Sequence, residues 1–189
     1  VGEKGDISEI IYYSQFTHAQ GLKYWIEYLR SLKWHCGGSL YWKFNDPIAP
    51  NRENMLFPSL MSCIDFFRLP KLAYYYARRA YEDKILAFRE DLEGNLAVYG
   101  CNETDSIADG TLCVSLKTYG GETVWCDTVP CIMDRDNASL LYRIPAERLA
   151  DGPSCSCYVY AVFTAGEERL VNLFHLTEVG EWNQVEMPR

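Results

Sequence analysis

The sequence predicts an α+β chain in which a helix–strand–helix segment, residues 1–84, precedes an antiparallel β-sandwich of immunoglobulin type, residues 85–189. Three observations support this prediction. Apolar residues recur every three or four positions over 14–33, a second helical pattern follows Pro70, and the second half of the chain breaks into short β-rich runs. The boundary is placed where the second helix ends in a run of charged residues.

The stretch from Ser14 to Lys33 has the spacing of an amphipathic helix. Ser14 can serve as the N-cap, and Gly37-Gly38 follows the last turn as a helix-ending signal. The apolar positions on the predicted inner face are Phe16, Ala19, Leu22, Trp25, Ile26, Leu29 and Leu32. We therefore predict a helix over 14–33.

Ser39 to Phe44 favours a strand with both faces covered, because its polar and apolar residues alternate too little for a half-exposed strand. A single buried strand needs neighbouring strands as partners for its backbone groups. We expect these neighbours to belong to a larger α/β fold that lies upstream of residue 1; otherwise the segment packs onto the sandwich as an appendage. Pro70 opens a second helix that is expected to end at residue 81.

Seven short β-rich runs follow one another in the second half of the chain, with turn residues between them. This spacing is typical of an immunoglobulin-like sandwich. Residues 93–95 and 119–122 have the composition of hairpin turns, and residues 145–153 fit a short helical turn between strands. The expected strands are 85–90, 96–102, 110–119, 123–129, 139–144, 156–164 and 169–176.

The charge of the chain disfavours nucleic acid as a partner. The formal net charge is -8 at pH 7, whereas phosphate binding depends on clustered Lys and Arg. The longest apolar runs are far shorter than the roughly 18–20 residues of a membrane-spanning helix. The first ten residues also lack the basic and apolar regions of a signal peptide. We expect neither a nucleic acid nor a membrane as a partner.

The eight cysteines contain no Cys-x-x-Cys pair, and no histidine stands at zinc-ligand spacing. We therefore expect no metal site, and nothing in the sequence calls for a cofactor. Buried free thiols explain the cysteines most simply, including Cys113 and Cys126, which interrupt apolar strands. Unpaired cysteines favour a reducing compartment such as the cytoplasm, while a periplasmic or secreted location stays open.

Two stretches of the N-terminal part carry a resemblance to a known family. Residues 12–46 read YYSQFTHAQGLKYWIEYLRSLKWHCGGSLYWKFND, and residues 64–81 read IDFFRLPKLAYYYARRAY. The Tyr-x-Ser-Gln start, the Ala-x-x-Leu-Lys-Tyr helix, the Gly-Ser-Leu-Tyr-Trp strand ending in Asn-Asp and the Pro-Lys-Leu-Ala-Tyr-Tyr helix occur together and in order. In these motifs the chain resembles the end of the catalytic barrel of family 2 glycoside hydrolases, most of all the β-mannosidase branch.

The resemblance implies that residues 1–84 are the C-terminal segment of a (β/α)8 barrel. Residues 14–33 would then be its seventh helix, 38–45 its eighth strand and 70–81 its eighth helix. The following run of strands is similar in placement to the first immunoglobulin-like domain after the barrel in that family.

The resemblance also implies three substrate-binding residues at the C-terminal end of the eighth strand, where barrel enzymes keep their active-site groups. Trp42 matches a tryptophan that forms part of the apolar floor under the sugar. Asn45 and Asp46 match the Asn-Asp at the rim of the pocket. Core packing remains the alternative for Trp42, and strand-end turn chemistry remains the alternative for Asn45 and Asp46.

Retaining glycosidases use two carboxyl groups about 5 Å apart. The resemblance places both catalytic glutamates on earlier barrel strands, before Val1, and Glu27, Glu53 and Glu82 do not stand in the matching context. No catalytic residue is therefore assigned in this chain. We expect the chain to be inactive alone and to act on a carbohydrate substrate only with upstream domains of the same polypeptide.

One departure from the family pattern leaves the sugar open. The β-mannosidase branch continues after Asn-Asp with Trp-Pro, whereas this chain has no tryptophan between residues 43 and 124. Residues 51–57 resemble an insertion. A β-mannosidase and a related enzyme with an altered pocket are therefore equally compatible with the sequence.

A non-catalytic role is the alternative function. The sandwich could bind a glycan or scaffold a neighbouring domain through surface aromatic residues such as Tyr119, Trp125 or Tyr158, although core packing also suits Trp125. A cut barrel also predicts that the strand with Leu40 and Phe44 is partly exposed in the isolated chain, which would favour self-association through the barrel edge.

Overall fold

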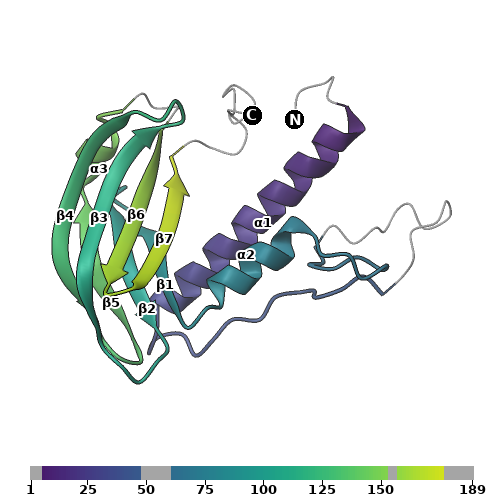
Figure 1. Cartoon of the computed structure of the whole chain (residues 1–189). Helices are drawn as coiled ribbons and strands as arrows, with labels where there is room; N and C mark the ends of the chain where they lie inside the picture. Colours follow the sequence, from purple (N-terminus) through teal and green to yellow (C-terminus); the bar gives the residue numbers. More distant parts are fainter. Residues whose placement is uncertain (1–5, 48–60, 153–156, 177–189) are drawn as a thin grey trace. The chain divides into compact units, whose positions relative to one another are not determined.

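The computed structural model describes residues 6–47, 61–152 and 157–176. The chain divides into two compact units: Val1–Ile26 with Gly38–Glu82, and Glu27–Gly37 with Asp83–Arg189. The first unit contains most of α1 and all of α2, and the second contains the end of α1, two antiparallel sheets and the short helix α3 (Figure 1). None of the helices within the described ranges is long and apolar enough to cross a membrane.

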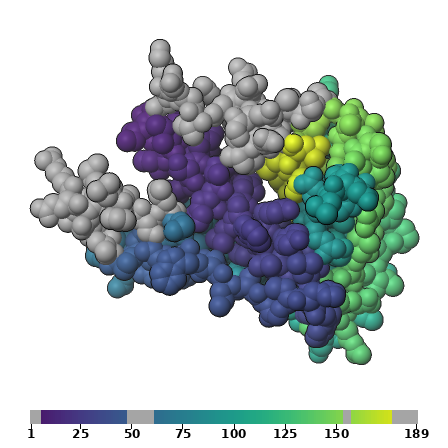
Figure 2. Space-filling model, turned by 180° about the vertical axis from the view of Figure 1, so that it is seen from behind, coloured from purple at the N-terminus to yellow at the C-terminus, as the bar shows by residue number. Residues whose placement is uncertain are grey.

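Helix α1, Ile7–Ser31, begins two turns before the predicted start. The backbone carbonyl of Asp6 accepts hydrogen bonds from the N–H groups of Glu9 and Ile10, so Asp6 rather than Ser14 opens the helix. The added turns expose apolar side chains at Ile7 and Ile11, which are 72% and 53% exposed. Figure 2 shows this part of α1, in purple, at the molecular surface.

Helix α2, Leu72–Ala80, confirms the second predicted helix. Small side chains allow it to pack closely against α1 within the first unit. Two apolar clusters hold the pair together, one around Ala19, Cys63 and Ala73 and the other around Ile26, Ala77 and Ala80. The apolar face predicted for α1 is thus confirmed at Ala19 and Ile26, but the prediction is wrong for Trp25, which is 61% exposed.

The strand predicted over Ser39–Phe44 does not form, and the prediction that both of its faces are covered is wrong for the described chain. Leu40 is fully exposed and Trp42 is 80% exposed. The physical reason is the lack of a neighbouring strand along this segment within the described residues, because an isolated extended segment cannot satisfy its backbone groups by strand pairing.

The second unit consists of two antiparallel sheets with strand orders β1-β2-β5 and β4-β3-β6-β7. In the immunoglobulin constant domain the fourth strand lies in the sheet of the first, second and fifth strands, whereas here β4 pairs with β3 in the other sheet. The strands are β1 (Lys84–Glu90), β2 (Leu96–Asn102), β3 (Ala108–Thr118), β4 (Thr123–Met133), β5 (Asn137–Ile144), β6 (Cys157–Ala165) and β7 (Glu168–His175). All seven predicted strands are confirmed, and α3 (Ala146–Leu149) confirms the predicted helical turn.

One core lies between the two sheets. Phe88 and Val98 come from the smaller sheet, and Leu112, Val159 and Phe163 come from the larger one; all of them are almost completely buried. Residues of both sheets share this core because alternate positions of each strand point inwards. The second unit is therefore a two-layer β-sandwich.

The end of α1 belongs to the second unit, where it contributes charged and polar contacts. Glu27 is 5% exposed and accepts a hydrogen bond of 3.0 Å from the side chain of Asn172. Lys33 forms ion pairs with Glu103, at 2.5 Å, and Asp136, at 2.6 Å. Residues 27–37 are thereby tied to the sandwich strands of their own unit.

Candidate substrate-contacting segment

The segment from Ser39 to Phe44 keeps the side-chain alternation of a strand although it is not paired as one. Tyr41 and Lys43 are partly buried, whereas Leu40, Trp42 and Phe44 are exposed. The ring of Tyr41 lies 6.4 Å from that of Tyr81, just after α2. One face of the segment thus contacts the helical layer of the first unit, and Trp42 lies on the other face.

The C-terminal end of this segment is fixed by backbone hydrogen bonds to residues 61–64. The carbonyl of Phe44 accepts from the N–H groups of Cys63 and Ile64, at 3.0 and 2.9 Å. The N–H of Asp46 donates to the carbonyl of Ile64, at 3.0 Å. The chain therefore supplies its own backbone partner where Asn45 and Asp46 stand.

Asp46 is the best-anchored of the three predicted site residues. Its Oδ2 lies 2.8 Å from the Nζ of Lys71, and only 12% of the Asp46 side chain is exposed. The same Nζ donates to the hydroxyl of Ser62, at 2.6 Å. Burial alone would raise the pKa of Asp46, but hydrogen bonds from Lys71 and Ser62 outweigh it and hold the pKa below its usual value.

The two carboxylate oxygens of Asp46 differ in their surroundings. Oδ2 is paired with Lys71, whereas Oδ1 is buried and has no hydrogen-bond partner among the described residues. A buried carboxylate oxygen without a donor is costly. The carboxylate therefore has unused acceptor capacity beside an exposed segment.

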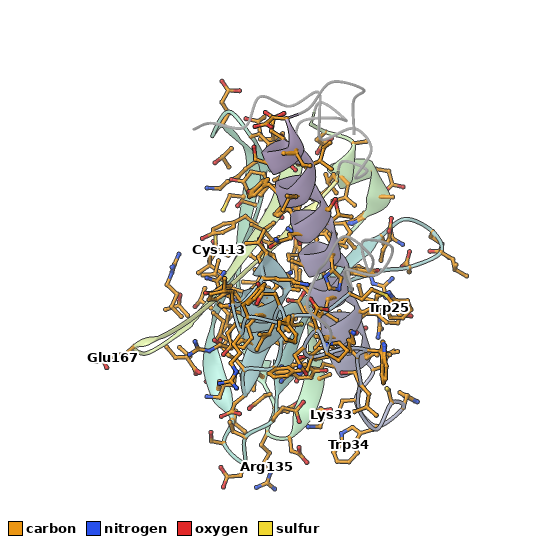
Figure 3. The ribbon with its side chains drawn as sticks, turned by 90° about the vertical axis from the view of Figure 1, so that its right-hand side faces the viewer. Trp25, Lys33, Trp34, Cys113, Arg135 and Glu167 are labelled. Carbon is orange, nitrogen blue, oxygen red and sulfur yellow. The ribbon has the colours of Figure 1, made fainter. Side chains whose placement is uncertain are left out.

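Asn45 and Trp42 complete the predicted set. Asn45 is exposed and forms an isolated bridge with Ile64, and Trp42 presents its indole to solvent. The structure thus places all three residues on one short segment, with Trp42 and Asn45 accessible and Asp46 held by an ion pair. The other tryptophan of the described first unit, Trp25, lies on α1 and not on this segment (Figure 3).

Two functional contacts escaped the sequence-based prediction. Lys71 and Ser62, which hold Asp46, lie 25 and 16 positions away in the sequence, a separation that no spacing rule connects to it. The Pro-Lys-Leu-Ala-Tyr-Tyr motif contained Lys71 but did not reveal its role. His18, on α1, also belongs to these surroundings, since burial and the nearby charge of Lys71 lower its pKa.

Comparisons with known proteins identify the relatives of this chain. No protein-family model matches it. A β-mannosidase of Capra hircus is 28% identical over 174 residues, which cover 84% of this chain and 19% of that enzyme. The chain is thus similar to family 2 glycoside hydrolases over nearly its whole length. The resemblance expected from the motifs, to the C-terminal part of such an enzyme, is confirmed.

Solved structures of family 2 enzymes show the same fold. The β-D-mannosidase of Dictyoglomus thermophilum matches 93% of this chain and 20% of its own with a TM-score of 0.77 and 24% identity. An exo-chitosanase of Amycolatopsis orientalis matches 85% of this chain and 18% of its own with a TM-score of 0.63 and 20% identity. The chain therefore spans about a fifth of the length of the family members it matches.

The three aromatic residues considered for glycan binding, Tyr119, Trp125 and Tyr158, differ in their contacts with the sandwich core. Trp125 packs against the sandwich core, where its Nε1 donates to the carbonyl of Arg148 at 3.0 Å. Tyr119 and Tyr158 are partly buried with ring centroids 5.4 Å apart, and Tyr119 also hydrogen-bonds His175. Packing against the core therefore accounts for Trp125.

The cysteines and acidic residues give no sign of a metal centre in the part of the chain that the structure describes. No group of three or more His, Cys, Asp or Glu side chains there could hold a metal ion. The seven described cysteines are free thiols, but Cys126 is exposed, so the expectation of burial is wrong for it. Glu27 is buried against Asn172, Glu82 is exposed, and Glu53 lies outside the described residues.

Proposed function

We propose that this chain supplies the closing part of a (β/α)8 catalytic barrel and the immunoglobulin-like domain after it in a retaining exo-β-glycosidase. The enzyme would remove terminal β-linked sugars from oligosaccharides or glycans, as a β-mannosidase does. Trp42, Asn45 and Asp46 would contact the sugar. The chain spans only part of its relatives, so this activity is proposed for the longer polypeptide and not for the chain alone.

The alternating exposure of residues 39–44 is the observation that carries this proposal. In a (β/α)8 barrel, one face of each strand contacts the outer helices and the other points into the barrel. The side of this segment with Tyr41 already contacts the helical layer of the first unit. The opposite side, with Leu40, Trp42 and Phe44, would then face the barrel interior, and Trp42 would lie near the end that opens into the sugar pocket.

The ion pair of Asp46 suits a residue that orients a sugar hydroxyl. Lys71 neutralises one oxygen, and the other is buried without a donor among the described residues, so it would accept from a sugar hydroxyl once substrate binding uncovers it. Hydrogen bonds to a charged acceptor are stronger than those between neutral groups, at about 1.5–3 kcal/mol. Asn45, exposed beside it, can both donate to and accept from hydroxyl groups.

The proposed reaction needs two carboxyl groups about 5 Å apart, one as acid and base and one as nucleophile. Asp46 does not suit the acid role, because Lys71 holds it charged, and it does not suit the nucleophile role, because its carboxylate is mostly buried in an ion pair. Neither Glu27 nor Glu82 lies on the segment of Trp42. We therefore assign both catalytic carboxyl groups to earlier strands of the proposed barrel and expect the chain alone to hydrolyse nothing.

The substrate class follows from the same segment. An indole beside an amide and a carboxylate suits the apolar face and the hydroxyl groups of a neutral terminal sugar. The missing second tryptophan leaves one wall of the proposed pocket different from that of the β-mannosidase branch. We therefore propose a β-mannoside as substrate, with a β-glucosaminide as the competing sugar.

An assay of two proteins tests this proposal. The chain alone and the longer polypeptide encoded by its gene are incubated with the p-nitrophenyl glycosides of β-D-mannose, β-D-glucosamine and β-D-glucose. We expect hydrolysis of the mannoside by the longer polypeptide and none by the chain. Hydrolysis by the chain, or no activity of the longer polypeptide on any of the three glycosides, would contradict the proposal.

The apolar surface of the first unit is consistent with a missing neighbour. Exposed large apolar side chains occur on α1, on the candidate segment and at residues 61–69, among them Ile7, Trp25, Leu40, Trp42, Phe44, Met61, Phe67 and Leu69. Scattered single residues need no explanation, but several on one small unit indicate a covered face. We propose that upstream domains of the same polypeptide cover it, and that the isolated chain self-associates through it.

Glycan binding by the second unit is a second candidate function, favoured by one observation. A shallow hollow of about 640 Å³ is lined by Trp34, Asp105, Arg135, Asp136 and Asn137. Trp34 is 73% exposed, and Figure 3 shows it at the same end of the sandwich as Arg135. An exposed indole beside polar groups can stack on a sugar.

Titration with manno-oligosaccharides tests this second function. The sugar should quench tryptophan fluorescence in the wild type and not in Trp34→Ala. An unchanged wild-type signal at millimolar sugar would exclude glycan binding by this hollow.

A further inference from the structure

Two cysteines on the β3–β4 pair bring their sulfur atoms into contact. The Sγ atoms of Cys113 and Cys126 lie 3.2 Å apart. Cys126 is exposed and Cys113 is partly exposed, so small reagents can reach the pair from solvent. Both are free thiols in this structure, and Cys113 is labelled in Figure 3.

The register of the two strands explains this contact. Cys113 lies opposite Thr128, and Cys126 lies opposite Ser115, so the two cysteines are diagonal neighbours. Diagonal positions on one face of an antiparallel pair are about 7–8 Å apart, and here the two sulfur atoms point into the space between them and meet. The residues on either side of Cys113 along β3 are buried in the sandwich core, which places both thiols on the outer face of the larger sheet.

We propose that Cys113 and Cys126 are a dithiol that a low-molecular-weight disulfide, such as oxidised glutathione, converts into an intrachain disulfide across β3 and β4. A disulfide bond is about 2.05 Å long, so the two sulfur atoms, now 3.2 Å apart, need to approach by about 1 Å. The bond also requires Cβ atoms about 3.5–4.5 Å apart, so closing a diagonal pair draws the two strands slightly together at this point. The two strands are already joined by their backbone ladder. The ladder keeps the two strands in register while the bond forms, so the movement required is local.

The exchange proceeds in two balanced steps. The thiolate of Cys126, the more exposed residue, attacks one sulfur of the oxidant, whose S–S bond breaks and releases one glutathione thiolate. The thiolate of Cys113 then attacks the Cys126 sulfur of this mixed disulfide and releases the second glutathione thiolate. Two electrons pass from the cysteines to the oxidant, and the two protons lost by the cysteines are taken up by the two leaving thiolates.

The surroundings set the pH at which this pair reacts. A hydrogen bond with the Cys113 thiol and then burial raise the pKa of Cys126, Asp127 raises it further, and Lys117 opposes them. Exchange needs a thiolate, so it should be faster in mildly alkaline buffer than at neutral pH. Burial raises the pKa of Cys101 to about 12, which makes that thiol a poor competitor.

Peptide mapping of the full chain tests the proposal. The folded chain is equilibrated with oxidised and reduced glutathione at pH 8.5, alkylated and digested with trypsin without reduction. Cleavage after Lys117 separates the two cysteines, so the disulfide links peptide 90–117 to peptide 118–135. These peptides also contain Cys101 and Cys131, and fragment spectra distinguish them. We expect a Cys113–Cys126 link that dithiothreitol reverses.

Single variants separate this pair from the other thiols. Cys113→Ser and Cys126→Ser should each abolish the link, and Cys113→Ser should leave Cys126 carrying one glutathione, which is the trapped first step. Cys36→Ser is the matched control and should leave the link unchanged. The proposal is overturned if Cys126 of Cys113→Ser is not modified by glutathione. It is also overturned if Cys126 is modified in that variant but the wild type forms no link under the same conditions. A link that persists in Cys126→Ser would contradict it as well.

Discussion

Asp46 combines an ion pair with an oxygen that lacks a donor, and its contacts determine how the candidate segment is held. The Nζ of Lys71 contacts both the carboxylate of Asp46 and the hydroxyl of Ser62. Because Lys71 directly precedes α2, this one ammonium group links the candidate segment to residues 61–64 and to the start of α2. Side-chain exposures of 12% and 18% for Asp46 and Lys71 mean that solvent screens this pair only partly.

Lys71→Met should loosen the candidate segment. The change leaves the Asp46 carboxylate mostly buried without its counter-charge, which should cost about 2–3 kcal/mol of local stability. Hydrogen exchange of residues 41–47 and of α2, followed by mass spectrometry, should become faster. The double variant Asp46→Asn with Lys71→Met removes both charges and should recover part of the lost local stability. Equal hydrogen exchange in the wild type and in Lys71→Met would contradict the role of Lys71 in holding the segment.

The pH dependence of the same region follows from the lowered pKa of Asp46. Because the folded state binds the proton less tightly than the unfolded state, the ion pair stabilises the fold above the unfolded pKa of about 3.9. That contribution is lost as the pH falls through the lower, folded pKa. Protection of α2 against hydrogen exchange should therefore decrease below about pH 4 in the wild type and less so in Asp46→Asn.

The sequence could predict which residues stand at the end of the candidate segment, but it could not predict the contacts that hold Asp46 in place. The motif containing Trp42, Asn45 and Asp46 identified the segment because those residues are adjacent. The contact between Asp46 and Lys71 joins residues 25 positions apart, and no local sequence pattern encodes it. The cysteine contact between β3 and β4 required the strand register, which the sequence did not specify.

Strand β3 contains a glycine, Gly110, that leaves no space for a side chain. A Cβ on Gly110 would lie 2.3 Å from the backbone oxygen of Thr164 and 2.9 Å from the ring of Phe163. Gly110→Ala should therefore lower the free energy of unfolding by about 1–3 kcal/mol through overpacking. Gly120→Ala is the matched control, because its Cβ would meet nothing closer than 3.5 Å. Urea denaturation measures both, and equal midpoints would refute this account of the β3–β6 pair.

Asn172 makes one of the polar contacts that hold the end of α1 within its own unit. Asn172 is 6% exposed and donates to the Glu27 carboxylate and to the backbone carbonyl of Leu86, at 3.0 and 2.6 Å. Asn172→Ala leaves two buried acceptors short of a donor and should cost about 2–3 kcal/mol. Hydrogen exchange of residues 27–33 should increase. Glu167→Ala, at an exposed turn position, is the control and should change neither quantity.

Elements with their own periodic signal were predicted well, and elements that depend on missing neighbours were not. The seven strands follow from apolar alternation and turn residues, and β2 has the predicted bounds. The start of α1 was placed too late, although Ile7, Ile10 and Ile11 continue the helical spacing and Asp6 precedes them. The strand over 39–44 needed partners for its backbone, and the described chain offers them only at its end.

The two units differ as whole folded bodies. The second unit has a closed core between two sheets, whereas the first exposes large apolar side chains around two helices and an unpaired segment. This contrast is consistent with a sandwich that folds by itself and a helical unit that requires additional polypeptide. Self-association of the isolated chain should therefore be detectable by analytical ultracentrifugation, and a strictly monomeric species at high concentration would count against it.

The role of Trp42 in the longer polypeptide is the most direct test of the proposed barrel and sugar pocket. We predict that Trp42→Ala lowers kcat/KM for p-nitrophenyl β-D-mannoside by about 10- to 100-fold, which corresponds to about 1.4–2.7 kcal/mol of lost transition-state binding. Leu92→Ala, at a fully exposed position in the β1–β2 turn, should leave kcat/KM within about twofold. A Trp42→Ala enzyme as active as the Leu92→Ala control would contradict the account.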